Sequence, residues 1–177
     1  MNIKEMPEKR HALLESLNEE LNAAEIAAVI REEEGAPEMV SAMLDELGDG
    51  DMEVLGDFFF RPFETEEDTT QYFSAVITIT DEIPGERLAE LYEAISYVNF
   101  SLPAGCFSID KDHRFLCFVL SIPLPVEMED PALFEEIDLA VGNAFAIADA
   151  HIGILSDVLS GKENADGVVA FLGGKGE

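Results

Sequence analysis

The chain has 177 residues and a formal net charge of −28, because 38 acidic residues stand against 10 basic ones. Hydrophobic residues make up 47 % of it, so the chain can bury a core and its acidity does not indicate intrinsic disorder. The charge argues against nucleic acids and anionic membranes as partners, since both are bound through Lys and Arg.

The acidic excess is concentrated at the two ends of the chain. Residues 1–70 carry 20 acids against 5 bases, and residues 125–177 carry 11 against 2. Solvated acidic faces are the simplest interpretation. A basic protein partner is one alternative, and mimicry of a nucleic acid is another.

The N-terminus is polar and amphipathic, so it does not resemble a signal peptide. We find no apolar run as long as a membrane span. The two cysteines, Cys106 and Cys117, are too few for a disulfide-rich secreted scaffold. These features together predict a soluble cytoplasmic protein.

The first 48 residues are expected to be helical. Leucines 13, 14, 17 and 21 follow helical spacing. Asn22 and Glu25 resemble a capping box that opens a second helix, and Pro37 opens a third. One broken helix followed by another is the alternative arrangement for this N-terminal part.

The next segments have the composition of strands. Residues 52–63 and 71–80 are rich in β-branched and aromatic side chains. In the second segment, Phe73 and Ile77 lie on one face while Ser74 and Thr78 lie on the other, as in a half-buried antiparallel strand. A tight turn at Gly56-Asp57 would divide the first segment into two short strands.

A helix is expected from Pro84 to Pro103, followed by a β-hairpin. The hairpin strands cover residues 106–109 and 115–122, with a polar turn between them. Both faces of the second strand are apolar, which places it either at the centre of a sheet or at a subunit interface.

Asp130-Pro131 begins a long C-terminal helix. Residues 161–177 are Gly-rich and are expected to form a flexible tail, whose VVAFL segment could dock on a groove or a sheet edge. Residues 1–160 are therefore predicted to form a single α+β domain, with the sheet and its helices in residues 52–160.

The search for catalytic, metal-binding and cofactor-binding residues assigns none. The histidines, at positions 11, 113 and 151, lack HxxxH or CxxC neighbours, and no phosphate loop or GxSxG motif occurs. A two-residue turn at Lys111-Asp112 would place Cys106 opposite Cys117. We favour two buried small hydrophobic residues there over a redox switch.

Residues 95–124 carry a family resemblance. A helix ending at Asn99, then Leu102-Pro103-x-Gly105, then Phe107-x-Ile109-Asp110 and an apolar strand resembles the YbjN-like family of bacterial proteins. That family is similar in fold to the class I chaperones of type III secretion. The long N-terminal helical region and the C-terminal tail depart from the family pattern.

The resemblance implies a compact α+β domain, often dimeric, that binds polypeptide and lacks catalytic residues. The expected fold is an antiparallel sheet flanked by helices, in the order helices, strands, helix, hairpin and long C-terminal helix. Proteins of this fold group include secretion chaperones, which are small, acidic and cytoplasmic, and proposed sensory regulators.

Our leading hypothesis is a non-enzymatic, chaperone-like or regulatory protein that binds a protein or peptide client as a homodimer. The residues assigned to the dimer or client surface are Tyr97, Phe100, Phe107, Phe115, Cys117 and Phe118. Two alternatives remain: a small enzyme with a carboxylate-lined pocket, and an acidic inhibitor that imitates an anionic ligand.

Overall fold

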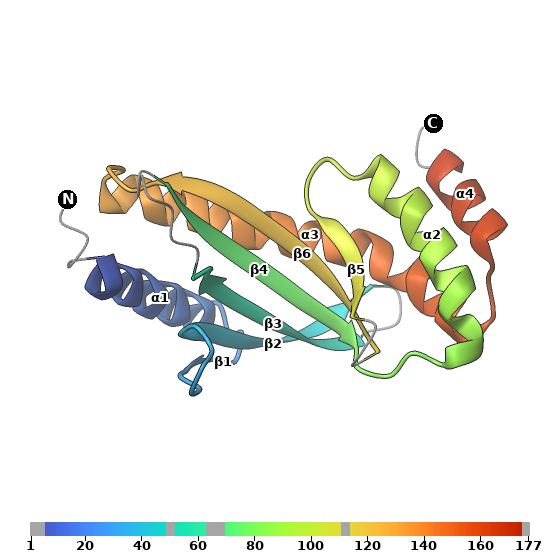
Figure 1. The fold of residues 1–177 in the computed structure, drawn as a ribbon, viewed down its shortest axis with the longest axis horizontal. Coiled ribbons are helices and arrows are strands. Elements are labelled where there is room, and N and C mark those ends of the chain that lie inside the picture. Colours follow the sequence, from blue (N-terminus) through green and yellow to red (C-terminus); the bar gives the residue numbers. More distant parts are fainter. Residues whose placement is uncertain (1–5, 49–51, 63–69, 111–113, 175–177) are drawn as a thin grey trace. The chain divides into compact units, whose positions relative to one another are not determined.

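The computed structural model describes residues 6–48, 52–62, 70–110 and 114–174, and within them the chain has an α+β fold (Figure 1). The strands form one six-stranded sheet in the order β1-β2-β3-β4-β6-β5. The strands are β1 (Ala28–Arg31), β2 (Met39–Leu47), β3 (Met52–Phe60), β4 (Thr70–Thr80), β5 (Cys106–Asp110) and β6 (Phe115–Pro125). The helices are α1 (Met6–Ala23), the 3-10 turn η2 (Gly85–Arg87), α2 (Leu88–Ser101), α3 (Asp130–Ser160) and α4 (Ala165–Gly174). The predicted fold class is confirmed.

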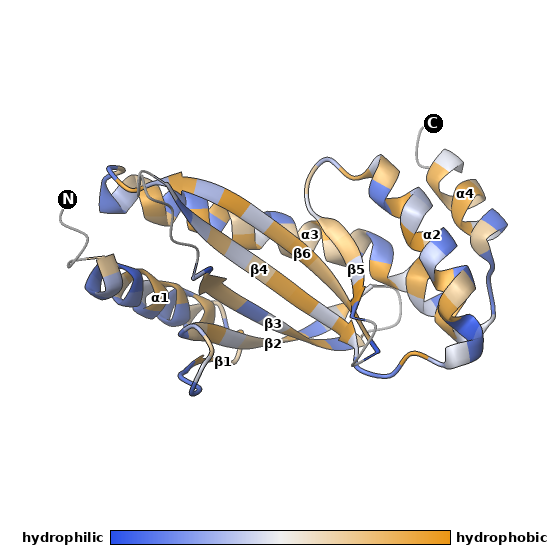
Figure 2. Ribbon diagram, viewed as in Figure 1, coloured by the Kyte–Doolittle hydropathy of each residue, from blue (hydrophilic) through white to orange (hydrophobic). Residues whose placement is uncertain are grey.

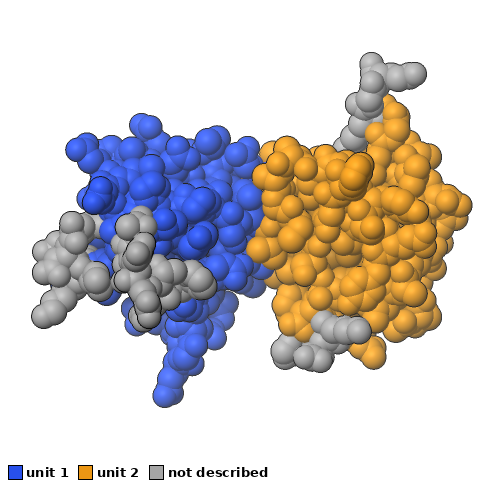
Figure 3. Space-filling model, turned by 45° about the horizontal axis from the view of Figure 1, so that its top comes forward, with its two compact units in different colours: residues 1–44, 55–76, 120–143 blue, residues 45–54, 77–119, 144–177 orange. Residues whose placement is uncertain are grey.

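The chain divides into two compact units, which Figure 3 shows in different colours. Unit 1 contains residues 1–44, 55–76 and 120–143, and unit 2 contains residues 45–54, 77–119 and 144–177. Each unit is described by itself below. The single domain expected for residues 1–160 stays a prediction.

The core of unit 1 lies between helix faces and the sheet. The predicted leucine stripe of α1 is confirmed, since Leu13, Leu14, Leu17 and Leu21 are all buried. The aromatic rings of Phe60 and Phe73 meet edge to face, with centroids 5.5 Å apart. Each fully buried Leu or Phe stabilises the fold by about 1.5–3 kcal/mol.

The expected second helix is wrong, because α1 ends where that helix was to begin. The Ile26 N–H donates to the Leu21 carbonyl at 2.9 Å, and the Glu25 N–H donates to the Asn22 carbonyl at 3.1 Å. Glu25 has a φ of 65°. This is a Schellman motif, in which a left-handed residue ends a helix. The chain then continues into β1, and no second helix begins at the capping box that the sequence predicted.

The expected third helix is also wrong, because residues 39–47 form β2. Val40, Ala42 and Leu44 are buried and alternate along one face. Val40 pairs with Ile30 of β1 in an antiparallel register. The apolar residues of this segment fit a helical period and a strand period equally well. Pairing with neighbouring strands decides in favour of the strand.

The two strand segments that follow are confirmed. β3 runs through Gly56 and Asp57 without a turn, so the alternative of two short strands is wrong. Asp57 is positioned by Ser41 of β2, whose Oγ donates to its Oδ1 at 2.5 Å. In β4, the predicted face of Phe73, Ala75, Ile77 and Ile79 is buried.

The C-terminal segment of unit 2 is a helix where a flexible Gly-rich tail was expected. Asn164 caps α4, because its Oδ1 accepts the Gly167 N–H at 3.0 Å and its carbonyl accepts the Val168 N–H at 3.2 Å. Figure 2 shows hydrophobic residues along this helix. Ala165 and Val168 are buried, and α4 packs against α2. The VVAFL segment therefore lies on a helix and not on a sheet edge.

The long helix α3 confirms the predicted C-terminal helix and spans 31 residues. Its buried residues follow one stripe, which includes Leu133, Ile137, Ile152 and Leu155. No apolar run of membrane-spanning length was expected from the sequence. Among the described residues, however, α3 is long and apolar enough to cross a membrane, judged by length and composition only. A core helix that buries one stripe of apolar side chains, as α3 does, can have the same length and apolar composition.

Candidate contact surface on helix α2

Helix α2 buries one face and exposes aromatic side chains on the other. Leu91, Ala94, Ile95 and Val98 form the buried face. On the opposite side Tyr92 and Tyr97 are each 40 % exposed, and Phe100 is 94 % exposed. We call Tyr92, Tyr97 and Phe100 the α2 aromatic face. Tyr97 and Phe100 are neighbours one turn apart, and Tyr92 lies two turns before Phe100. These exposed rings form a candidate contact surface.

The six residues assigned to a contact surface from the sequence do not lie together on the surface. Phe107, Cys117 and Phe118 are buried, and Phe115 is half-buried. The rings of Phe107 and Phe118 lie 5.1 Å apart in the core of unit 2. Of the six, Tyr97 and Phe100 are exposed. Their role in binding stays a prediction.

The strand with two apolar faces is an inner strand of the sheet. β6 has β4 on one side and β5 on the other. Leu116, Cys117 and Phe118 are consecutive and all buried, so both faces of the strand are covered at this point. The central-strand interpretation therefore explains the composition of β6 without a second subunit.

The expected pairing of the cysteines is wrong by two residues. Cys106 pairs with Val119, and Cys117 pairs with Ser108. Cys106 is exposed, whereas Cys117 is buried. Burial is the main cause that raises the pKa of Cys117 to about 11, so this thiol stays protonated at neutral pH. This geometry does not support a redox switch formed by the two thiols.

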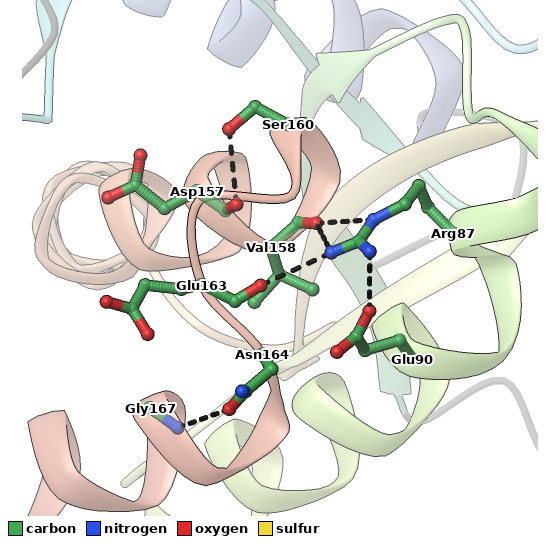
Figure 4. Close-up of polar contacts among 8 residues, drawn as sticks. All are labelled: Arg87, Glu90, Asp157, Val158, Ser160, Glu163, Asn164 and Gly167. Carbon is green, nitrogen blue, oxygen red and sulfur yellow. Dashed lines mark hydrogen bonds and ion pairs between the residues drawn. The ribbon is translucent and has the colours of Figure 1, made fainter.

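Arg87, at the start of α2, binds the last turn of α3 and the segment that joins α3 to α4 (Figure 4). Its Nε and Nη2 donate to the Val158 carbonyl at 3.0 and 2.6 Å, and Nη2 also donates to the Glu163 carbonyl at 3.2 Å. Its Nη1 lies 2.8 Å from Glu90 Oε2. The last carbonyls of a helix lack partners inside the helix, and here a guanidinium supplies one.

Sequence reasoning did not single out Arg87. Between residues 71 and 124 the bases are Arg87, Lys111 and Arg114. An isolated arginine at the start of a predicted helix, in so acidic a chain, could have drawn attention to Arg87. The sequence could not identify the carbonyls that its guanidinium binds, because they lie about 70 residues away.

Unit 2 also contains an open cavity of about 550 Å³ near the C-terminal end of α3. Its lining residues are Met52, Gly153, Ile154, Ser156, Asp157, Lys162 and Phe171. Among the lining residues that the structure describes, Asp157 is the one carboxylate, and the Lys162 Nζ lies 3.1 Å from its Oδ1. This mixed lining does not match a carboxylate-lined catalytic pocket.

The buried polar side chains in the described part of the chain are Ser41, Gln71 and Ser74. Among the residues whose burial the structure describes, no Asp or Glu is buried. Within the same ranges, no three His, Cys, Asp or Glu side chains are grouped so that they could hold a metal ion.

No protein-family model and no curated protein sequence matches the chain. Among solved structures, the chain is similar to YbjN from E. coli, a proposed transcription regulator. The two are 16 % identical, and the similarity covers 78 % of this chain and 92 % of YbjN with a TM-score of 0.40. At this level the resemblance is weak and concerns the fold alone.

Proposed function

We propose that the chain is a non-enzymatic, chaperone-like or regulatory protein that binds another polypeptide through the α2 aromatic face. The observation that supports the proposal is the 94 % exposure of Phe100 on the same helix as the partly exposed Tyr92 and Tyr97. Burial of apolar surface contributes about 25 cal/mol per Å², and aromatic anchors often dominate binding. A client that covers these rings would gain this free energy.

The negative charge around the α2 aromatic face indicates which kind of client it would favour. Glu86, Glu90 and Glu93 lie on or just before α2, and the Tyr97 hydroxyl donates to Glu93 Oε1 at 3.3 Å. The whole chain carries a formal net charge of −28. Opposite charge favours encounter and orientation of two partners. The client we propose presents apolar side chains flanked by Lys or Arg.

We also propose a homodimer, without assigning its contact to the α2 aromatic face, because that face is assigned to the client. Phe107, Cys117 and Phe118 are buried inside the chain, so their apolar character does not support a dimer contact. Light scattering between 1 and 100 µM tests the homodimer. A monomer throughout that range would exclude the dimer and leave client binding to be tested separately.

We further propose membership of the YbjN-like family, on the pattern around residues 99–107. Two residues of that pattern have structural roles in this chain. Asn99 binds the backbone of Phe107. Gly105 has a φ of 71°, and a Cβ atom there would lie 2.4 Å from Phe118 Cζ. Both residues fix the corner between α2 and β5.

An aggregation assay tests client binding. The chain is mixed with a heat-denatured basic enzyme, and turbidity is followed over time. We expect the wild type to suppress turbidity and the Phe100→Ser variant to lose most of that effect. Suppression should weaken as salt is raised, because charge attraction between client and chain is screened.

Val29→Ser is the matched control, since Val29 is an exposed apolar residue (55 %) on a strand far from α2 in the sequence. Both variants should keep the wild-type circular dichroism spectrum. Equal suppression by the wild type and the Phe100→Ser variant would contradict the assignment of the client to the α2 aromatic face.

A further inference from the structure

Asn99, in the last turn of α2, binds both backbone polar groups of one residue on strand β5. The Phe107 N–H donates to Asn99 Oδ1 at 2.7 Å. In return, Asn99 Nδ2 donates to the Phe107 carbonyl at 3.0 Å. A side-chain amide therefore forms the same two hydrogen bonds with Phe107 that a residue of a neighbouring strand would form.

This contact matters because it lies on an edge strand of the sheet. β5 is the last strand of the sheet and pairs with β6 on one side. In an antiparallel pair, every second residue directs its N–H and C=O away from its partner strand. Such outward groups on an edge strand attract strands of other molecules. The Asn99 amide occupies those groups at Phe107.

The strand at the other end of the sheet has the same arrangement. Asn22, near the end of α1, donates from Nδ2 to the Ala28 carbonyl at 3.0 Å, and its Oδ1 lies 3.4 Å from the Ala28 N. The Met43 N–H donates to the Ala27 carbonyl at 2.9 Å. Residue 27 thus faces β2, so residue 28 directs its backbone groups outward.

We infer that Asn22 and Asn99 are edge caps, which close the two ends of the sheet to strand addition by a second copy or an extended peptide. Each cap comes from the helix that directly precedes the edge strand. This inference deepens the proposed function, because it specifies the mode of binding. A client would bind by packing against a helix face and not by extending the sheet.

Amide hydrogen exchange tests the cap on β5. In the Asn99→Ala variant, the Phe107 N–H should exchange about tenfold faster or more, the factor expected when a hydrogen bond of about 1.4 kcal/mol is lost. The Leu116 amide of β6 should keep its wild-type rate. Asn143→Ala, at an exposed asparagine of α3, is the control. Unchanged exchange at Phe107 would overturn the cap.

Self-association tests whether the caps close the edges. The Asn22→Ala/Asn99→Ala double variant is compared with the wild type and Asn143→Ala by light scattering and infrared spectroscopy. We use 0.3 M salt, because the net charge otherwise keeps copies apart. The double variant should gain mass with concentration and an intermolecular β-sheet band. A double variant that keeps the wild-type mass at all concentrations would overturn the inference.

If the alanine variants lose their circular dichroism signal, Asn22→Leu and Asn99→Leu replace them. Leucine keeps the approximate shape of the asparagine side chain and removes both its Nδ2 donor and its Oδ1 acceptor, so the same outcomes apply. No client is present in either measurement. The edge-cap inference and the proposed client site on α2 can therefore be refuted independently of each other.

Discussion

His11 Nδ1 lies 2.6 Å from Glu38 Oε1, which joins helix α1 to the residue that directly precedes strand β2. The hydrogen bond to Glu38 is the largest cause that raises the pKa of His11 above its ordinary value of 6.5, and the charges of Glu38 and Glu15 act in the same direction. A raised pKa in the folded state means that protonation of His11 favours folding.

The stability supplied by this pair should therefore be fully present below pH 6.5 and decline as the pH rises through the folded-state pKa of His11. An NMR titration of the ring protons measures that pKa directly. Glu38→Gln should return it towards 6.5. A His11 pKa that Glu38→Gln leaves unchanged would contradict the cause assigned here.

Glu25→Gly should stabilise the chain by up to about 1 kcal/mol. Glu25 holds a φ of 65° at the end of α1, a conformation that costs a residue with a Cβ atom and costs glycine little. Glu19→Gly, inside the same helix, should instead destabilise it by about 1 kcal/mol. Urea unfolding midpoints measure both, and two destabilised variants would refute the role of Glu25.

Gly105→Ala should destabilise the chain strongly, because the new Cβ would lie 2.4 Å from Phe118 Cζ and 2.8 Å from the Val119 carbonyl oxygen. Gly142→Ala should have the opposite effect and add about 1 kcal/mol of stability, since its Cβ position in α3 has no atom within 4 Å other than those of the local helix. Thermal unfolding compares the two substitutions. Similar midpoints for both variants would show that the space around Gly105 is not tight.

Arg87→Ala should destabilise unit 2 by about 2 kcal/mol, the scale of hydrogen bonds that involve a charged group. The α4 amides should exchange faster, because the Glu163 carbonyl loses its contact with the guanidinium. Arg87→Lys should not restore stability, since an ammonium cannot bind several acceptors in a fixed plane. Arg31→Ala, at an exposed ion pair with Glu33, should have little effect. Full rescue by lysine would contradict the bidentate contact with Val158.

The two thiols should react with a thiol reagent at very different rates. Cys106 is exposed, whereas Cys117 is buried and has a pKa of about 11. At pH 8 the native chain should show one fast and one slow thiol, and Cys106→Ser should remove the fast phase. Two fast thiols in the wild type would contradict the burial of Cys117.

Much of the fold could be predicted where one periodicity dominates a segment. The leucines of α1, the alternation of Phe73 to Ile79 and the long stripe of α3 each fit a single kind of element. β2 could not be predicted in this way, because Met39, Val40, Met43 and Leu44 also match a helix. The local pattern is ambiguous there, and the register with β1 removes the ambiguity.

The contact surface was harder to predict than the fold. Phe100 and Phe107 look alike in the sequence, yet one is 94 % exposed and the other 2 %. Phe100 lies on the exposed face of α2, whereas Phe107 lies on β5 and packs against Phe118 inside unit 2. The folded chain alone fixes these two environments. The position of α4 was obscured by its flanking glycines, although Asn164 and the apolar segment after it are helix signals.

The division into units has a consequence for how the protein can be taken apart. Going along the sequence, the unit changes five times, after residues 44, 54, 76, 119 and 143. Neither unit corresponds to a continuous fragment, so no single truncation or protease cut can release one intact. Both need segments distant in sequence to come together, which makes slow folding and one cooperative unfolding transition the expected behaviour. Calorimetry with a single peak, and equal calorimetric and van't Hoff enthalpies, would show the two units to be one thermodynamic domain.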